Sequence, residues 1–257
     1  MEYIEYSAAT LVGQRENNQD GYAANAMLSC PNVCDIQFST GTRDIHELNV
    51  FAVCDGVGSF AQSGDAAHAA LQRLYEERER YLQMNEQERP LLSDWVAYAL
   101  DSAQKSLKDY CSQHDAQGSA TMTILAVAGD GEYVFGNIGD SPAYLLRKKQ
   151  RLVELSERHN LAAEKRRRGE KPSPDDSCAL LHHLGETGRN SLTAHWVSGT
   201  LEEGDALLLC SDGVSNTLSE RKLASLLKKG ANAIAFAEPA AAAPGADNCT
   251  AIVVRIG

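Results

Sequence analysis

The apolar positions of this chain form many short β-type runs and two longer helical stripes. Residues 2–12 are rich in β-forming side chains, and the run at 49–55 has the length and Val/Phe content of a buried strand. Residues 29–47 between them are polar and irregular, which favours a loop or a long hairpin end. The chain is therefore expected to begin with strands.

Two amphipathic helices are predicted next, because apolar residues recur at helical spacing over 64–83 and over 93–113. Ser93 is a suitable N-cap for the second helix. The charged stretch EERER at 76–80 is more typical of a solvated helix face than of a binding patch.

Most of the remaining sequence is of β type. Gly-Asp-Gly at 129–131 is a strong hairpin signal. Residues 160–190 are polar and are interpreted as a helix followed by a flap, residues 219–228 as a helix, and the Ala/Pro-rich residues 239–246 as a loop. The predicted strands of this part are 121–128, 132–138, 143–147, 151–155, 192–197, 206–210 and 250–256. The order of elements predicts an α+β sandwich with an antiparallel core, in which residues 1–257 form a single domain.

Composition narrows the function classes. The 257 residues are 43% hydrophobic and 23% charged, which is ordinary for a globular protein with one core. The net charge of −11 and the pI of about 5.1 argue against DNA or RNA as a partner. A small phosphorylated substrate stays compatible if bound divalent cations neutralise the negative field locally.

The seven cysteines are odd in number and scattered, as in a reducing compartment. Cys54, Cys210 and Cys249 lie in apolar runs, where a free thiol packs as a small hydrophobe. Cys30 and Cys34 have no second pair at metal-ligand spacing, which disfavours a zinc site. With no signal peptide and no apolar run of about 20 residues, we expect a soluble, cytoplasmic protein, by default a monomer.

Three aspartates share one sequence context. Asp55 ends an apolar run and is followed by Gly56, Asp212 follows another apolar run, and Asp247 precedes the last strand. An isolated Asp-Gly pair is more often only a turn, and we assign no function to the one at 129–131. Carboxylates that meet at strand ends need a positive charge among them, and hard divalent cations supply it.

A series of motifs covers nearly the whole chain: RENNQD at 15–20, FAVCDGVGS at 51–59, GSATMTILAV at 118–127, FGNIGDSPAYLLR at 135–147, LSERHN at 155–160, GDALLLCSDGVSNTL at 204–218 and DNCTAIVV at 247–254. In this order they resemble the protein phosphatase 2C family of metal-dependent phosphatases, in its compact bacterial form. The resemblance implies a four-layer α-β-β-α sandwich, made of two antiparallel sheets flanked by helices.

The resemblance also implies a set of metal ligands. Asp55 would bridge two Mg²⁺ or Mn²⁺ ions, the carbonyl of Gly56 would bind one of them, and Asp212 and Asp247 would hold the other. Asp20 would organise metal-bound water from behind the ligands.

Two further positions complete the implied site. Arg15 would bind the substrate phosphate through its planar donor fork. Asp140 corresponds to a position linked to a third cation in bacterial members of the family.

The activity implied is hydrolysis of phosphoserine and phosphothreonine by direct attack of a hydroxide that bridges the metal ions. The partners would be phosphorylated proteins, the substrates of a Ser/Thr kinase. Two other hypotheses stay open: a catalytically weak module of the same fold that binds phosphoproteins, and a metal hydrolase for small phosphorylated metabolites.

Several residues depart from the family pattern. Gln19 replaces a common Glu, and in SERHN Arg158 stands where relatives have Asp. His159 is interpreted as bonded to the backbone rather than catalytic. The basic stretch KRRRGEK at 165–171 fits a flap that attracts phosphoproteins or a solvated helix face equally well. His182 and His183, near Cys178, are not expected to bind metal.

Overall fold

The computed structural model describes residues 1–33, 35–57, 62–129, 131–148, 150–186 and 192–257. These residues build two six-stranded sheets with antiparallel pairing throughout. Sheet A has the order β4 (Gln37–Asp44), β1 (Tyr3–Leu11), β12 (Cys249–Ile256), β11 (Ala206–Cys210), β8 (Ala143–Leu146) and β9 (Leu152–Glu154). Sheet B has the order β10 (His195–Thr200), β7 (Glu132–Ile138), β6 (Met122–Ala128), β5 (Asn49–Asp55), β2 (Asp20–Ala24) and β3 (Met27–Leu28).

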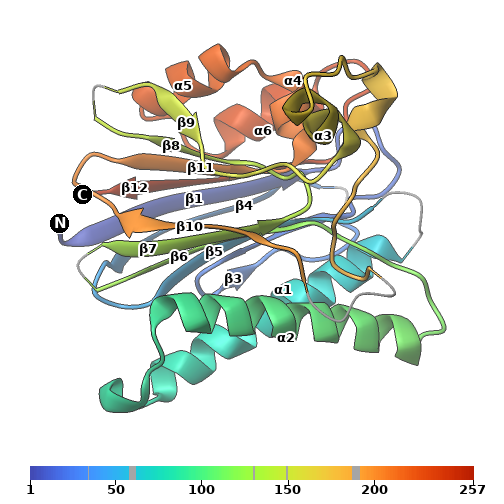
Figure 1. Cartoon of the computed structure of the whole chain (residues 1–257). Helices are drawn as coiled ribbons and strands as arrows, with labels where there is room; N and C mark the ends of the chain where they lie inside the picture. The colour runs from blue at the N-terminus through green and yellow to red at the C-terminus, as the bar shows by residue number, and fades with distance from the viewer. Residues whose placement is uncertain (34, 58–61, 130, 149, 187–191) are drawn as a thin grey trace.

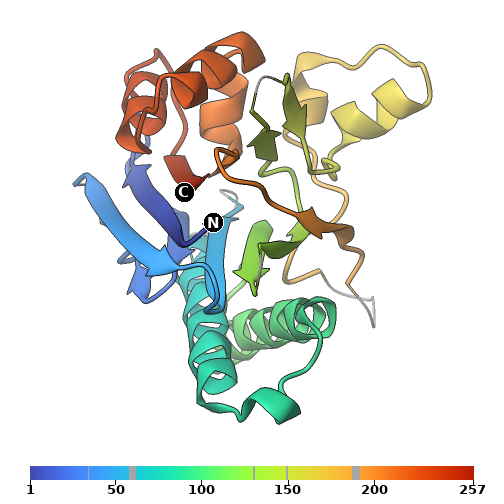
Figure 2. The ribbon, with the colours of Figure 1, turned by 90° about the vertical axis from the view of Figure 1, so that its left-hand side faces the viewer.

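Helices cover the outer face of each sheet (Figure 1). α1 (Ser63–Gln83) and α2 (Leu92–Gln113) lie against sheet B, whereas α4 (Asp212–Thr217), α5 (Glu220–Lys228) and α6 (Ile234–Ala241) lie against sheet A. After a quarter turn the two sheets face each other between the helical layers (Figure 2). The predicted α-β-β-α sandwich is confirmed.

Each interface between layers has its own apolar core. Phe51, Val53 and Phe135 pack between the two sheets, where alternate strand residues point inward. Leu71 of α1 packs with neighbours on sheet B, and Phe236 of α6 with neighbours on sheet A. These three cores account for the predicted amphipathic patterns.

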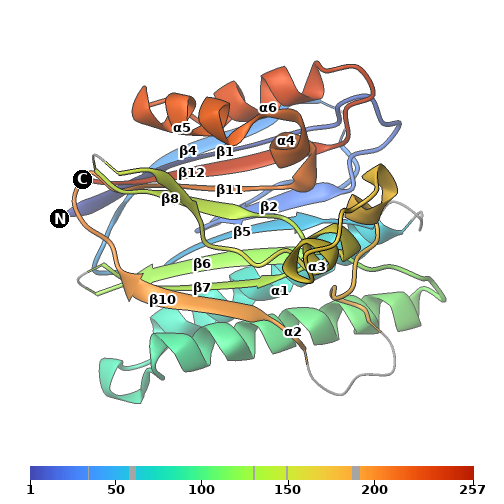
Figure 3. The ribbon, with the colours of Figure 1, turned by 45° about the horizontal axis from the view of Figure 1, so that its top comes forward.

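The first and last strands lie side by side in sheet A. Their register runs from Ile4 opposite Ile256 to Leu11 opposite Cys249. Both chain termini therefore lie at one end of the sandwich, and α3 (Leu161–Arg167) lies toward the other end (Figure 3). We call the end where Leu11 pairs with Cys249 the distal end.

Several sequence predictions are confirmed. The first strand, both long helices and the β6–β7 hairpin are present, although Asp130 of that hairpin lies outside the described residues. α2 begins at Leu92 with Leu91 as its N-cap, so Ser93 is not the cap. Strand β10 begins three residues later than predicted, at His195.

Two predicted loops are wrong in part, at residues 37–44 and 239–241. The polar stretch 29–47 contains β4, an edge strand whose side chains alternate between half-buried and exposed, so no apolar face announces it. The Ala/Pro-rich stretch 239–246 continues α6 as far as Ala241, with Pro239 inside the helix. Alanine is a strong helix former, and the small side chains let α6 pack closely on sheet A.

Two short 3₁₀ helices, Glu86–Glu88 and Pro174–Ser177, complete the described elements. In the part of the chain that the structure describes, no helix has the length and apolar character of a membrane span.

Candidate metal centre

Two predicted site residues face each other at the distal end of sheet B. Asp20 is the first residue of β2, Asp55 is the last residue of β5, and the antiparallel register pairs them directly. Asp20 is buried and Asp55 is half-buried. The buried residues of β5 fix the strand in the core, so the Asp55 carboxyl lies where the strand leaves it.

Sheet A contributes two more carboxyls at the same end. Asp212 begins α4 directly after β11, and Asp247 lies just before β12. The two strands are neighbours, with Cys210 opposite Ala251. The sandwich thus brings together aspartates that are far apart in the sequence.

Burial and mutual repulsion raise the pKa values of these carboxyls. The pKa of Asp55 lies well above its ordinary value because of burial and then the charges of Asp20, Asp212, Asp140 and Asp247. Burial is also the main cause that raises the pKa of Asp212 to about 7 and that of Asp20 to about 6. Hydrogen bonding to Asp55 offsets part of both rises.

Buried hydroxyls support Asp20 from behind. Ser211 and Thr250 hydrogen-bond its carboxyl, which limits the rise of its pKa. The hydroxyls of Thr10 and Thr250 lie 2.6 Å apart, and the Asn18 side chain donates to Thr10 at 3.0 Å. Asp20 of sheet B is therefore held by hydroxyl groups on or next to strands of sheet A.

Asn248 joins the segment after β1 to the start of β12. Its amide donates to the carbonyls of Val12 and Asn17 at 2.8 and 3.0 Å, and its side-chain oxygen accepts from the backbone of Gln19 at 2.9 Å. Since Asp247 is the preceding residue, these bonds also fix the position of its backbone.

Gly213 allows the backbones around Asp212 and Asp247 to approach closely. A Cβ atom at position 213 would overlap the carbonyl oxygen of Asn248 and touch the side chain of Asp247. The glycine at this position therefore provides room for the backbone that leads into β12.

We expect Gly213→Ala to lower the free energy of unfolding by about 1–3 kcal/mol, the usual cost of overpacking. The added methyl group should also displace Asp247, and this displacement should weaken Mn²⁺ binding. Urea unfolding and titration calorimetry measure the two effects, with Thr217→Ala as an exposed control in the same helix. A Gly213→Ala protein with the stability of the control would contradict this packing.

Asp140 differs from the other four aspartates. It is buried, and burial raises its pKa, but its carboxyl accepts a bond of 2.9 Å from Asn160. The charge of Arg158 also lowers its pKa. Arg158 itself donates to Glu154 and to the Tyr144 hydroxyl, each at 2.8 Å. Asp140 thus already has partners within the protein.

Arg15 lies on the solvent side of the carboxyl group cluster. Its guanidinium donates to the Asp247 carboxylate at 2.6 Å, and the two side chains are 57% and 44% exposed. This pair raises the pKa of Arg15, and the charges of Asp212 and Asp55 add to the effect. The positively charged guanidinium of Arg15, with its exposed N–H donors, therefore lies beside the acidic cluster.

The cluster has the chemistry of a site for hard divalent cations. Its donors are all oxygens, and the Oδ2 atom of Asp20 is buried without a hydrogen-bond partner. As the side chains lie, no three His, Cys, Asp or Glu residues among those described form a group with metal-ligand geometry. The residue types and their burial fit Mg²⁺ or Mn²⁺.

The basic stretch at 165–171 is largely ion-paired. Lys165 contacts Asp176 at 2.8 Å, and both Arg167 and Arg168 pair with Glu164 on the same helix. These pairs favour the hypothesis of a solvated helix face over a surface that attracts phosphoproteins.

His159 is buried, and its Nδ1 atom accepts from the backbone N–H of Gly139 at 3.3 Å. Burial, and then the nearby His182 and His195, lower the pKa of His159 to about 4. The hypothesis of a backbone-bonded histidine is confirmed.

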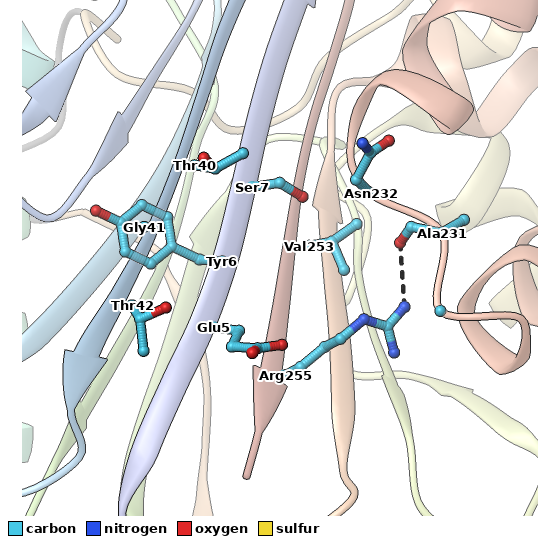
Figure 4. A pocket seen from close by; sticks show the side chains of 11 residues that line it. Glu5, Tyr6, Ser7, Thr40, Gly41, Thr42, Ala231, Asn232, Val253 and Arg255 are labelled. Atoms are coloured by element: carbon cyan, nitrogen blue, oxygen red, sulfur yellow. Dashed lines mark hydrogen bonds between the residues drawn. The ribbon is translucent and has the colours of Figure 1, made fainter.

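A cavity of about 850 Å³ is lined by Val57, Ser119 and Leu180, the last of these in the predicted flap. Val57 follows Asp55 by two residues, but no predicted site residue lines the cavity. A second cavity, of about 310 Å³, lies between β1, β4, β12 and the segment before α6 (Figure 4). There Arg255 donates to the carbonyl of Ala231. This second cavity is near the chain termini and contains none of the predicted site residues.

Comparison with known proteins decides the family. A sequence profile described as protein phosphatase 2C matches residues 37–243, most of the chain. The chain belongs to the protein phosphatase 2C family. By family it is a protein phosphatase, as the resemblance of its motifs implied.

Three similar proteins illustrate the relationship within this family. The serine/threonine phosphatase stp of Listeria monocytogenes is 29% identical over 219 residues, which are 80% of this chain and 84% of that protein. The PPM Ser-Thr phosphatase MsPP of Mycobacterium smegmatis, solved in complex with cacodylate, is 26% identical with a TM-score of 0.73 over 98% of each chain. The catalytic domain of the phosphatase PstP, solved with two manganese ions, has 20% identity and a TM-score of 0.68 over 99% of this chain and 100% of that one.

Some residues of the centre were not predicted from the sequence. Asn248, Thr250 and Ser211 lie within the quoted motifs, yet no role was assigned to them. Their polar side chains next to predicted ligands were the available signal. Their hydrogen bonds join segments remote in sequence, so only the structure shows what they support.

Proposed function

We propose that this chain is a Mg²⁺- or Mn²⁺-dependent protein phosphatase that hydrolyses phosphoserine and phosphothreonine. The observation that carries the proposal is the cluster of buried, mutually repelling carboxyls beside an exposed arginine. Membership of the protein phosphatase 2C family supports it, as do relatives named serine/threonine phosphatases.

The ligand roles follow from position. We assign Asp55 to both cations, the carbonyl of Gly56 to one, and Asp212 and Asp247 to the other. Asp20 is assigned to organise the water around the cations. The two manganese ions in PstP support this stoichiometry. When bound, such cations neutralise the phosphate and make a coordinated water acidic enough to attack phosphorus at neutral pH.

We also propose that a third cation binds at Asp140, but only weakly. Asn160 and Arg158 already stabilise the Asp140 carboxylate, so a cation there must compete with both. We therefore propose two tightly bound ions and, at Asp140, at most a weak third.

The phosphatase's own side chains position the substrate. Arg15 is exposed and carries a donor fork that matches two phosphate oxygens. His159 is a poor proton donor to the leaving alkoxide, because its ring is buried and its low pKa keeps it neutral near pH 7. The proton for the leaving group is therefore assigned to solvent water.

Replacing Arg15 with alanine should raise KM for a phosphothreonine peptide about 10- to 100-fold, since hydrogen bonds to charged groups contribute about 1.5–3 kcal/mol. Folding stability should change little, because the side chain is 57% exposed. Steady-state kinetics and thermal unfolding measure the two.

Arg15→Lys is the matched variant, because it keeps the charge and removes the planar fork. We expect a KM between those of the wild type and Arg15→Ala. Unchanged KM in both variants would exclude Arg15 from phosphate binding.

Phosphorylated proteins are the proposed substrates, and a Ser/Thr kinase is the proposed source of their phosphate. The cavity of about 850 Å³ beside Val57 and Ser119 offers room for the polypeptide that flanks the phosphorylated residue.

Residues 1–257 are proposed to form one phosphatase domain, because β1 and β12, which are far apart in the sequence, are neighbours in one sheet. A monomer is proposed as the default oligomeric state. The cysteines among the described residues are unpaired, which suits the reducing cytoplasm.

Comparing substrates tests the function. With Mn²⁺ present, kcat/KM should be higher for a phosphothreonine peptide than for sugar phosphates. A preference for sugar phosphates would identify a metabolite hydrolase instead. Tight binding of the phosphopeptide without any turnover would identify a binding module.

A further inference from the structure

The ladder between β5 and β6 is irregular where it reaches Asp55. In a regular hydrogen-bonded antiparallel pair, the two facing residues exchange both of their N–H to C=O bonds. Thr121 faces Asp55 and donates its N–H to the Asp55 carbonyl at 2.8 Å. The return bond is different, because the N–H of Asp55 donates to the Thr121 hydroxyl at 3.1 Å. The Thr121 carbonyl instead accepts from the Cys54 thiol at 2.8 Å.

The Thr121 hydroxyl has a second partner on the other side of the centre. It lies 2.7 Å from the hydroxyl of Ser141, the residue after Asp140. The carbonyl of Ser141 accepts a bond of 2.5 Å from the Thr123 hydroxyl. Thr121, Thr123 and Ser141 are all almost completely buried. The pair Thr121–Ser141 therefore connects the backbone of Asp55 to the loop that carries Asp140.

We propose that Thr121 and Ser141 are positioning residues for the metal centre, which set the orientation of Asp55 through a buried hydroxyl bridge. Neither has been assigned a role by motif or comparison. The inference rests on the proposed function, since it treats Asp55 as the ligand of both cations.

The hydroxyl at position 121 is needed because it is the acceptor for the N–H of Asp55. Without it, the N–H of Asp55 has no acceptor unless it shifts to the Thr121 carbonyl, which already accepts from the Cys54 thiol. Either outcome changes the backbone at the last residue of β5, and so the direction of the carboxyl. Replacing a group that orients a metal ligand typically lowers metal affinity about 10- to 100-fold.

Thr121→Val removes the hydroxyl and keeps the β-branched shape. We expect its dissociation constant for Mn²⁺, measured by titration calorimetry, to rise about 10- to 100-fold. Thr121→Ser keeps the hydroxyl and should restore wild-type affinity. Ser7→Ala is the matched control, because it also removes a buried hydroxyl that accepts a backbone N–H, here from Ala233 at 2.9 Å, and has no contact with the bridge. It should bind Mn²⁺ as the wild type does.

A second readout needs no metal. Hydrogen exchange at the Asp55 amide in the metal-free protein should be faster in Thr121→Val and Ser141→Ala than in Ser7→Ala. If Thr121→Val does not fold, Ser141→Ala decides: it must weaken Mn²⁺ binding and speed this exchange. Wild-type affinity and exchange in Ser141→Ala, or in Thr121→Val, would overturn the bridge. A wild type that binds no Mn²⁺ would instead refute the proposed function, while the exchange comparison would still decide whether the bridge exists.

Discussion

Asp55→Asn is expected to lose Mn²⁺-dependent phosphatase activity by more than about 100-fold, since even residues behind metal ligands change affinity or activity by about 10- to 100-fold. The same variant should be more stable than the wild type when no metal is present. The charge of Asp55 is opposed by burial and by four other aspartates, which is why its pKa is raised. A neutral amide removes this penalty while keeping the shape.

The gain in metal-free stability should appear as a melting temperature in EDTA that is higher than that of the wild type, because the raised pKa of Asp55 means that its charge is disfavoured in the folded protein. Calorimetry in EDTA measures it, and peptide hydrolysis with Mn²⁺ measures the activity.

Asp205→Asn is the matched control. Asp205 is also buried, but its carboxyl bonds Arg147 and the backbone of Glu202, each at 3.0 Å, near the chain termini. This variant should lose stability and keep activity. If Asp55→Asn also lost stability in EDTA, the carboxyls would not be under mutual repulsion.

The stabilisation of the protein by Mn²⁺ should depend strongly on pH. The pKa values of Asp20 and Asp212, about 6 and about 7, lie above the ordinary 3.8. The metal-free native state therefore binds more protons than the unfolded chain between about pH 4 and pH 7. Its stability should be greatest at the acidic side of this window and should fall as pH rises through it.

Mn²⁺ reverses this loss only where the carboxylates are ionised. At pH 7.5, with metal at about 100 times its dissociation constant, we expect about 2.7 kcal/mol of added stability. The corresponding rise in melting temperature is about 5–10 °C. At pH 5 the rise should be much smaller, because protons compete for the same oxygens. An equal rise at both pH values, measured by thermal unfolding, would mean that Mn²⁺ binds elsewhere.

The sequence indicated that the candidate ligands meet at one end of the sandwich, and the reason is physical. Asp55 and Asp212 each follow an apolar run, and a strand that is buried up to its last residue leaves a carboxyl at its end. The family motifs then supplied their relation to Asp20 and Asp247. The two-sheet architecture followed from the same resemblance, and the structural comparisons confirm it.

The failures have physical causes as well. Strand β4 has no apolar face because it is an edge strand, and it owes its place to the ladder with β1. Helix α6 contains Pro239, a residue that normally marks a helix end, yet its small apolar face is buried against sheet A. In both cases tertiary contacts outweighed the local pattern.

The hydrogen bonds that hold the aspartates of the centre in place could not be predicted from the sequence either. The bond from Asp55 to the Thr121 hydroxyl depends on an irregular ladder, and Asn248 joins segments at opposite ends of the chain. No periodicity or motif spacing encodes such contacts. These contacts fix where the candidate ligands lie, whereas the motifs only propose which residues they are.

Release of phosphate from a phosphothreonine peptide by the purified wild-type protein tests the central claim most directly, with Mn²⁺ and then with excess EDTA. We expect turnover that saturates with Mn²⁺, stops in EDTA and returns when Mn²⁺ is restored. Turnover that continues in EDTA, or no turnover at any Mn²⁺ concentration, would contradict a metal-dependent phosphatase built on Asp20, Asp55, Asp212 and Asp247.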